Sequence, residues 1–188
     1  MIAMCIEIEA KLKVDSLPPI EQRLAELGAE FLAEQLHRDY YFDDEDWSLK
    51  NSDQGLRLRR KLIGGSEKNL LTYKGPKQRD NFKKRREIEI EIGNHKLCEQ
   101  LLCALGFKRA LVFEKRRRLW QVGDCRIALD DLPLLGSFLE IEGPDDERIA
   151  DVQEKLGLAN LRHIVESYAD LMEKELRRLD KKEREFSL

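Results

Sequence analysis

The sequence lacks the features that mark several large functional classes. No apolar run is long enough to span a bilayer, and charged residues appear within a few positions of the first, so we expect neither a membrane anchor nor a signal peptide. No glycine-rich P-loop occurs, which leaves a Walker-type ATPase unsupported. The four cysteines, Cys5, Cys98, Cys103 and Cys125, form no CxxC pair that would indicate zinc or redox chemistry. Cys98 and Cys103 lie in a helical apolar pattern and are predicted to be core thiols. We expect a soluble, reduced, cytoplasmic protein.

Net charge is also almost absent, although charged residues are abundant. They make up 38% of the 188 residues, but 34 basic and 37 acidic side chains leave a net charge of only -3. This balance gives no overall attraction to nucleic acid or to an anionic membrane, so neither is predicted as a partner. The charges are instead sorted locally along the chain, and this sorting carries the functional signal.

The first sorted stretch is Glu7-Ile8-Glu9-Ala10-Lys11, in which polar and apolar residues alternate. In a β-strand alternate side chains share a face, so Glu7, Glu9 and Lys11 would point the same way. Two carboxylates can hold a divalent cation, and the cation and the lysine together can hold an anion. The ordinary alternative is a half-exposed strand with its charges in water. The return of the same pattern in later segments argues against that alternative.

Alternation and turn residues predict about eight strands, mostly joined by hairpins, and a few helices. This is an α+β fold with a large antiparallel sheet. Asp15 or Ser16 is predicted to cap the first helix, and the polar segment 78–84 is predicted to be a mobile loop. The predicted strands span 7–14, 31–42, 56–61, 70–74, 86–92, 111–121, 126–130 and 138–142, and the helices span about 16–28, 95–105, 145–156 and the residues from about 161 onward, whose last part is predicted to be a solvated or fraying tail.

A short internal recurrence links three of these segments. In each, a Glu-x-Glu strand is followed by an amphipathic helix that ends at Leu-Gly. If the recurrence is structural, the fold contains strand–helix units whose acidic residues occupy equivalent places. The three pairs are Glu7-x-Glu9 with Leu27-Gly28, Glu89-x-Glu91 with Leu105-Gly106, and Glu140-x-Glu142 with Leu156-Gly157.

Sorting of charge by strand predicts where the polar faces point. A merely solvated face would mix both signs, whereas a row of like charges is unfavourable without a counter-ion. A water-filled tunnel with an acidic patch for metal and a basic lining for phosphate relieves both repulsions, while helices cover the apolar outer face. Acids dominate the strands around Glu7, Glu89 and Glu140, and bases dominate those around Arg57, Lys74 and Lys115.

Taken in order, these motifs resemble the CYTH family, also called triphosphate tunnel metalloenzymes. The resemblance covers about residues 1–172 as one CYTH domain, with 173–188 as its charged helical tail. The stretch Leu129–Pro133 followed by Gly136–Glu140 is most similar to class IV adenylyl cyclases. The matching stretches are Glu7-Ile8-Glu9-Ala10-Lys11, Tyr41-Phe42-Asp43, Gly55-Leu56-Arg57-Leu58-Arg59, Thr72-Tyr73-Lys74-Gly75-Pro76, Arg86-Glu87-Ile88-Glu89, Glu114-Lys115-Arg116-Arg117 and Phe138-Leu139-Glu140-Ile141-Glu142.

The resemblance implies an eight-stranded antiparallel closed β-barrel, open at both ends, with helices packed outside and a triphosphate bound inside with Mg²⁺ or Mn²⁺. A salt bridge across the tunnel wall is the alternative for any single charge, and it is preferred for Lys61, Arg85 and Glu91 near the strand ends. The implied triphosphate-binding residues are Lys11, Arg57, Arg59, Lys74, Lys115 and Arg117, with Lys11, Lys74 and Lys115 as catalytic candidates. The implied metal ligands are Glu7, Glu9, Glu140 and Glu142, with Glu87, Glu89 and Asp130 as further candidates.

Three functions remain open at this level. The first is a class IV adenylyl cyclase, which converts ATP to cyclic AMP and pyrophosphate. The second is an inorganic or thiamine triphosphatase. The third is a non-catalytic module that binds polyphosphate or nucleotide, although paired carboxylates argue against it because phosphate binding alone requires only bases. A homodimer is plausible because related folds often pair. The three histidines, His37, His95 and His163, receive no role.

Overall fold

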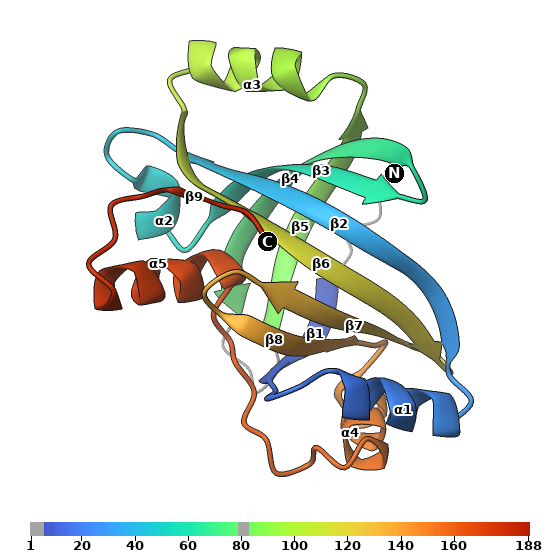
Figure 1. The fold of residues 1–188 in the computed structure, drawn as a ribbon. Coiled ribbons are helices and arrows are strands. Elements are labelled where there is room, and N and C mark those ends of the chain that lie inside the picture. Colours follow the sequence, from blue (N-terminus) through green and yellow to red (C-terminus); the bar gives the residue numbers. More distant parts are fainter. Residues whose placement is uncertain (1–5, 79–82) are drawn as a thin grey trace.

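The computed structural model describes residues 6–78 and 83–188, and for Ile6, Glu7, Lys77, Gln78, Lys83 and Lys84 it describes the backbone only (Figure 1). Cys5 and most of the predicted 78–84 loop lie outside the described residues. No helix in the described ranges has both the length and the hydropathy needed to cross a membrane. The elements are β1 (Ile6–Lys13), α1 (Pro18–Glu26), β2 (Glu30–Asp43), α2 (Ser48–Asn51), β3 (Gly55–Ile63), β4 (Ser66–Gln78), β5 (Lys83–Ile92), α3 (His95–Ala104), β6 (Lys108–Val122), β7 (Cys125–Leu132), β8 (Gly136–Glu142), α4 (Asp146–Lys155), α5 (Tyr168–Arg178) and β9 (Glu185–Phe186).

The eight long strands form one antiparallel, strongly curled sheet in the order β2-β3-β4-β5-β1-β8-β7-β6. Strand β2 pairs with β3 on one side and with β6 on the other, so the curl brings the two ends of this order together. The short β9 adds a parallel pairing to β6. The α+β class and the eight-stranded antiparallel sheet are therefore confirmed. The eight predicted strands all exist, and most extend a few residues beyond their predicted ends.

The outer face of β1, β8 and β7 is apolar and is covered by α1 and α4 (Figure 1). Leu12, Leu139 and Ile141 point outward from their strands and are fully buried against the two helices, as is Ile149 of α4. This arrangement agrees with the prediction from alternation. Helix α1 differs in one detail, because its N-cap is Leu17 with no side-chain cap, so the predicted capping by Asp15 or Ser16 is wrong.

Helix α3 covers the sheet only in part, because it lies beyond the ends of the strands (Figure 1). Leu102 is buried in a cluster with Tyr40 and Leu58, but Leu97, Leu101 and Leu105 are 60–66% exposed. The prediction of a core thiol is wrong for the exposed Cys103, while Cys98 is partly buried beside the same cluster.

The C-terminal segment differs most from the prediction. Residues 161–167 are not helical, and α5 begins only at the Ser167 cap, where the Ser167 and Asp170 side chains form a reciprocal capping box. Tyr168, Met172 and Leu176 recur at helical spacing and are buried. They pack with Leu111, Phe113, Leu132 and Phe138, which project from the inner face of the curled sheet. The end of the chain is ordered too, since Phe186 of β9 is buried in the same cluster. Helix α5 thus covers the inner face at one end.

The internal recurrence has a structural counterpart. The three Glu-x-Glu strands, β5, β1 and β8, are consecutive neighbours in the sheet, and each is followed by a helix. A glycine follows two residues after the last residue of each helix, at Gly28, Gly106 and Gly157, and all three have a positive φ, which suits glycine because it has no Cβ. The acidic residues of the recurrence therefore lie on three adjacent strands.

The outer apolar layer yields a test of this architecture. Leu139→Ala should lower the free energy of unfolding by about 2–5 kcal/mol, because it leaves a cavity between β8 and the helices. Leu97→Ala on the exposed face of α3 should change it by less than about 0.5 kcal/mol. Urea unfolding of both variants measures the difference, and equal effects would contradict the placement of these two leucines.

Candidate active site

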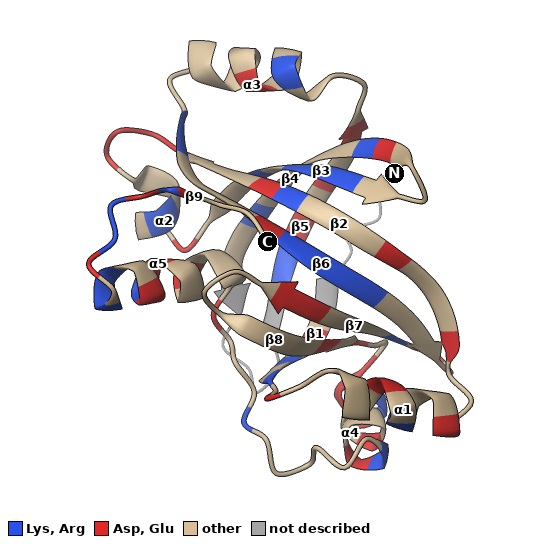
Figure 2. Cartoon of the chain, viewed as in Figure 1, with Lys and Arg blue, Asp and Glu red and all other residues tan. Residues whose placement is uncertain are grey.

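A cavity of about 300 Å³ lies inside the curled sheet and is lined by the inward side chains of its strands. Strands β5, β1 and β8 supply carboxylates to it, and we call them the acidic wall. Strands β3, β2 and β6 are also consecutive neighbours, and we call them the basic wall because β3 supplies Arg57, Arg59 and Lys61 to the cavity and β6 supplies Lys115 and Arg117. Figure 2 shows the run of basic residues along β6. The predicted sorting of charge by strand is thus a sorting between two walls of one cavity.

Lys11 on β1 lies within the acidic wall and is almost fully buried. Its ammonium nitrogen is 3.3 Å from Glu140 Oε1 and 4.0 Å from Glu9 Oε1. It also donates a hydrogen bond to the carbonyl oxygen of Glu166 at 3.1 Å and lies 4.2 Å from the centre of the Tyr168 ring. The segment leading into α5 therefore helps to hold this lysine in position.

Asp130 on β7 anchors the cations of β6. Its carboxylate accepts hydrogen bonds from Lys115 at 3.1 Å, from Arg117 at 2.7 and 2.5 Å, and from the Tyr168 hydroxyl at 2.9 Å. Burial alone would raise the pKa of Asp130, but Arg117 and then Lys115 lower it on balance. Arg117 also bonds Glu140, which links the two walls directly. Asp130 is thus an ionised carboxylate surrounded by donors.

Lys115 is the cation whose charge depends most on its surroundings. Burial and then the neighbouring Arg117 lower its pKa to about 7, despite the opposing effect of Asp130. Its ammonium nitrogen lies 4.8 Å from the centre of the Tyr168 ring. Because an added anion favours the charged form, a bound phosphate would hold this lysine protonated.

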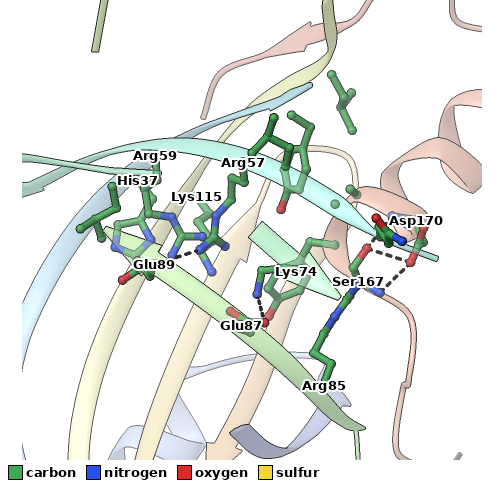
Figure 3. Close-up of a pocket in the computed structure, with 18 of the residues that line it drawn as sticks. His37, Arg57, Arg59, Lys74, Arg85, Glu87, Glu89, Lys115, Ser167 and Asp170 are labelled. Atoms are coloured by element: carbon green, nitrogen blue, oxygen red, sulfur yellow. Dashed lines mark hydrogen bonds and ion pairs between the residues drawn. The ribbon is translucent and has the colours of Figure 1, made fainter. Parts of the chain in front are cut away.

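The cations of β3 are held in a different way. Arg59 donates two hydrogen bonds of 2.6 Å to Asp39, a bidentate pair that is almost fully buried. Burial tends to raise the pKa of Asp39, but Arg59 lowers it well below its usual value. Arg57 donates to the Thr72 hydroxyl at 3.2 Å and lies 3.6 Å from Glu89 (Figure 3). Both guanidinium groups are therefore oriented before any ligand binds.

The carboxylates of the acidic wall have the donor chemistry of a site for a hard cation. Glu9 lies directly opposite Glu142 in the register of β1 and β8, and both line the cavity. Like charges at facing positions are unfavourable without a cation between them, and Mg²⁺ takes oxygen ligands. Across the ranges that the structure describes, no three acidic, histidine or cysteine side chains form a ready-made metal cluster. The side chain of Glu7 lies outside those ranges.

Most of the predicted site residues therefore meet in one place. Of the three residues expected to be structural, Lys61 and Arg85 line the cavity, and Arg85 also donates to the carbonyls of Gly75 and Asp53. Glu91 pairs with Lys68 at the surface. Asp130 lies behind the lining, bonded to Lys115 and Arg117. The predicted residues that line the cavity are Glu9, Lys11, Arg57, Arg59, Lys74, Glu87, Glu89, Lys115, Arg117, Glu140 and Glu142.

Sequence reasoning missed several side chains in and behind this lining. His37 and Asp39 share the inner face of β2. The sequence shows their alternate spacing, but β2 does not carry the row of like charges that marked the other strands. Thr72 is buried between Arg57 and Glu89. Tyr168 was missed because it lies on a helix, far in sequence from the strands it contacts. Its helical spacing with Met172 was the available signal.

Comparison with known proteins gives a consistent result. The model of the CYTH domain matches residues 5–168. A Methanocaldococcus jannaschii protein provisionally named an adenylate cyclase is 33% identical over 80% of this chain and 81% of its own. The adenylate cyclase CyaB of Aeromonas hydrophila is 27% identical over 90% of both chains.

Solved structures share the fold. The PH1819 protein of Pyrococcus horikoshii has a TM-score of 0.77 at 31% identity, covering 90% of this chain and 99% of its own. HpAC1 of Hippeastrum, described as having a dominant triphosphatase activity, has a TM-score of 0.70 at 17% identity, covering 93% and 96%.

The buried Arg59–Asp39 pair can be tested separately from activity. Asp39→Asn should lower the free energy of unfolding by about 3–5 kcal/mol, because it leaves the Arg59 charge buried and uncompensated. Glu67→Gln removes the partner of Arg60 in a pair that is about one-third exposed, and it should cost less than about 1 kcal/mol. Chemical denaturation of the two variants checks the contrast, and a small effect of Asp39→Asn would show that Arg59 has another anion or water to compensate it.

Proposed function

Because the chain belongs to the CYTH domain family, we propose that it is a metal-dependent enzyme that acts on a triphosphate-containing small molecule. In this proposal the curled sheet is a closed tunnel that holds the substrate between its walls. One observation carries the proposal: within one cavity, the cations of β3 and β6 face the carboxylates of β1, β5 and β8. Binding phosphate alone would require only the basic wall. A polyanion held together with a cation requires both.

The basic residues bind the phosphate oxygens. Arg57, Arg59 and Arg117 have planar guanidinium groups that match two phosphate oxygens at once, whereas Lys11, Lys74 and Lys115 act as point charges. Asp39 keeps Arg59 in position, and Asp130 does the same for Lys115 and Arg117. Preorganised charges of this kind stabilise charge that develops during phosphoryl transfer.

The acidic wall would hold the divalent metal, Mg²⁺ or Mn²⁺. We assign Glu9, Glu140 and Glu142 to it, with Glu7, Glu87 and Glu89 as further candidate ligands. Asp130 serves in this proposal as an anchor for Lys115 and Arg117, because its oxygens already accept from three side chains. When bound, such a cation polarises phosphoryl oxygens as a Lewis acid. The protein side chains position the phosphate chain against it and exclude bulk water.

The reaction that we favour is that of a class IV adenylyl cyclase. The ribose 3′-oxygen of ATP would bond to the α-phosphorus as the bond between that phosphorus and the β-phosphate oxygen breaks, so that pyrophosphate leaves and the hydroxyl proton passes to pyrophosphate or to water. The names of the two relatives described above support this reaction. The alternative is hydrolysis of inorganic or thiamine triphosphate, in which water attacks the terminal phosphorus, and the activity described for HpAC1 keeps this alternative in view. The same lining serves both reactions, and they differ in which phosphorus lies in line with the nucleophile.

Product analysis separates these reactions. Purified protein is incubated with ATP, inorganic triphosphate and thiamine triphosphate, each with Mg²⁺ or Mn²⁺ and with a chelator as control. We expect cyclic AMP and pyrophosphate from ATP, only when metal is present. Release of orthophosphate instead would establish a triphosphatase. Tight binding of all three compounds without turnover would leave only a binding module and would contradict an enzyme.

The metal assignment predicts the behaviour of one carboxylate. Glu9→Gln should raise the metal concentration needed for half-maximal turnover by at least about tenfold, since it removes a proposed ligand oxygen. The matched control is Glu91→Gln, at an exposed position on the neighbouring β5 where Glu91 pairs with Lys68. Titration of activity with Mg²⁺ and Mn²⁺ measures the shift. Identical titrations for the two variants would remove Glu9 from the metal ligands.

A further inference from the structure

His37 on β2 is a buried residue of the cavity that the proposed roles do not use. It is 2% exposed, and the strand register places Lys61 of β3 on one side of it and Lys115 of β6 on the other. It lines the same cavity as Arg59 and Lys115 (Figure 3). His37 differs from the lysines and arginines around it, because an imidazole carries no positive charge unless it is protonated.

The ring of His37 is held in one orientation by Gln35, its neighbour on the same face of β2. The Nε2 atom lies 2.8 Å from Gln35 Oε1. Because Gln35 presents its carbonyl oxygen, Nε2 carries the hydrogen and donates it. The same contact leaves Nδ1 with a lone pair and no hydrogen. Gln35 therefore selects the tautomer in which Nδ1 is an acceptor.

The charges around the ring keep it neutral. Burial first, and then Arg59, Lys115, Arg117 and Lys61, lower the pKa of His37 far below its usual value. A second proton on Nδ1 is thus strongly opposed while these four cations face the ring from β3 and β6. The Nδ1 atom therefore keeps its lone pair as an acceptor.

Nδ1 is also the end of the ring that has no partner. It is buried, and among the residues that the structure describes no hydrogen-bond donor contacts it. Leaving a buried polar atom unpaired costs about 1–3 kcal/mol, which is a reason to look for a ligand. Phosphate oxygens are acceptors and cannot satisfy a lone pair. A hydroxyl group or a water molecule can donate a hydrogen bond to Nδ1. The nucleophile is a hydroxyl group in the proposed cyclase reaction and a water molecule in the proposed hydrolysis.

We propose that His37 positions the nucleophile, with Nδ1 accepting a hydrogen bond from the attacking hydroxyl group and Gln35 fixing the ring. This inference rests on the proposed function and adds to it the residue that orients the reacting oxygen. The hydrogen bond turns one oxygen lone pair away from the ring and towards the phosphate chain held by Arg59 and Lys115. The group held is the ribose 3′-hydroxyl in a cyclase and water in a triphosphatase.

Two substitutions at His37 distinguish the two ring nitrogens. An asparagine places its carbonyl oxygen near the position of Nδ1, whereas a glutamine reaches the position of Nε2. His37→Gln should therefore lower kcat about 100-fold with KM changed less than about threefold, because a misplaced nucleophile costs about two orders of magnitude while phosphate binding remains. His37→Asn should recover at least tenfold of that loss. Steady-state kinetics with ATP and with inorganic triphosphate shows which nucleophile is held.

The chain supplies a matched control outside the cavity. His163 makes the same kind of contact, with its Nε2 atom 2.8 Å from Gln153 Oε1. His163→Gln and His163→Asn should leave kcat within about twofold of the unsubstituted protein. Urea unfolding of all four variants identifies any loss of folded protein, and kcat is then taken per folded molecule.

The outcomes separate this inference from the proposed function. Turnover by the unsubstituted protein together with an unchanged kcat in His37→Gln would overturn the role of His37 alone. Equal losses in His37→Gln and His37→Asn would overturn the assignment to Nδ1. A rise in KM without a fall in kcat would show that His37 binds phosphate, which also contradicts the proposal. Absence of any turnover by the unsubstituted protein would overturn the proposed function, and this inference with it.

Discussion

The structure depends on compensation of buried charge. An ionised group that is removed from water loses several kcal/mol of hydration unless other charges and hydrogen bonds replace the solvent. Inside this sheet Lys11, Lys115 and Asp130 are almost completely buried, and each is in contact with groups of opposite sign. Many ionised side chains can line this cavity only because acidic strands and basic strands face one another. Any change that removes one member leaves its partners in a medium of low dielectric constant.

The same constraint bears on the proposed binding of a polyanion. One carboxylate, Asp130, is shared by Lys115, Arg117 and the Tyr168 hydroxyl, and Arg117 also bonds Glu140. Burial first, and then the neighbouring Arg117, lower the pKa of Lys115, so its surroundings oppose the charged form of the lysine. In the proposed function, a triphosphate would offset the repulsion between these cations, and this gain would favour its binding. The apolar contacts of α1 and α4 with β1, β7 and β8 hold these strands in register, so the charged side chains on the inner face stay opposite one another.

Several of these features could be predicted from the order of residues because they are local. Alternation along a strand is a property of consecutive residues, so the inward faces of Glu9-x-Lys11 and Arg57-x-Arg59 followed directly from it. The Leu-Gly helix ends were predictable for the same reason. Asp39 and His37 were not predicted as site residues because their strand mixes residue types. The ion pair between Asp39 and Arg59 can be recognised only when the pairing of β2 with β3 is known. Tyr168 lies 38 residues beyond the Asp130 that it contacts.

The amino-acid sequence by itself determined which side chains share a face and which strands carry acids or bases, because these depend on a repeat of two residues. It also determined the CYTH family, because the motifs recur in one order. Only the tertiary structure decided that β5, β1 and β8 lie together opposite β3, β2 and β6, that α5 packs onto the inner face at one end, and that Asp130 is held by three donors. Those outcomes depend on contacts between distant segments, and the energy of a buried charge depends on every group around it.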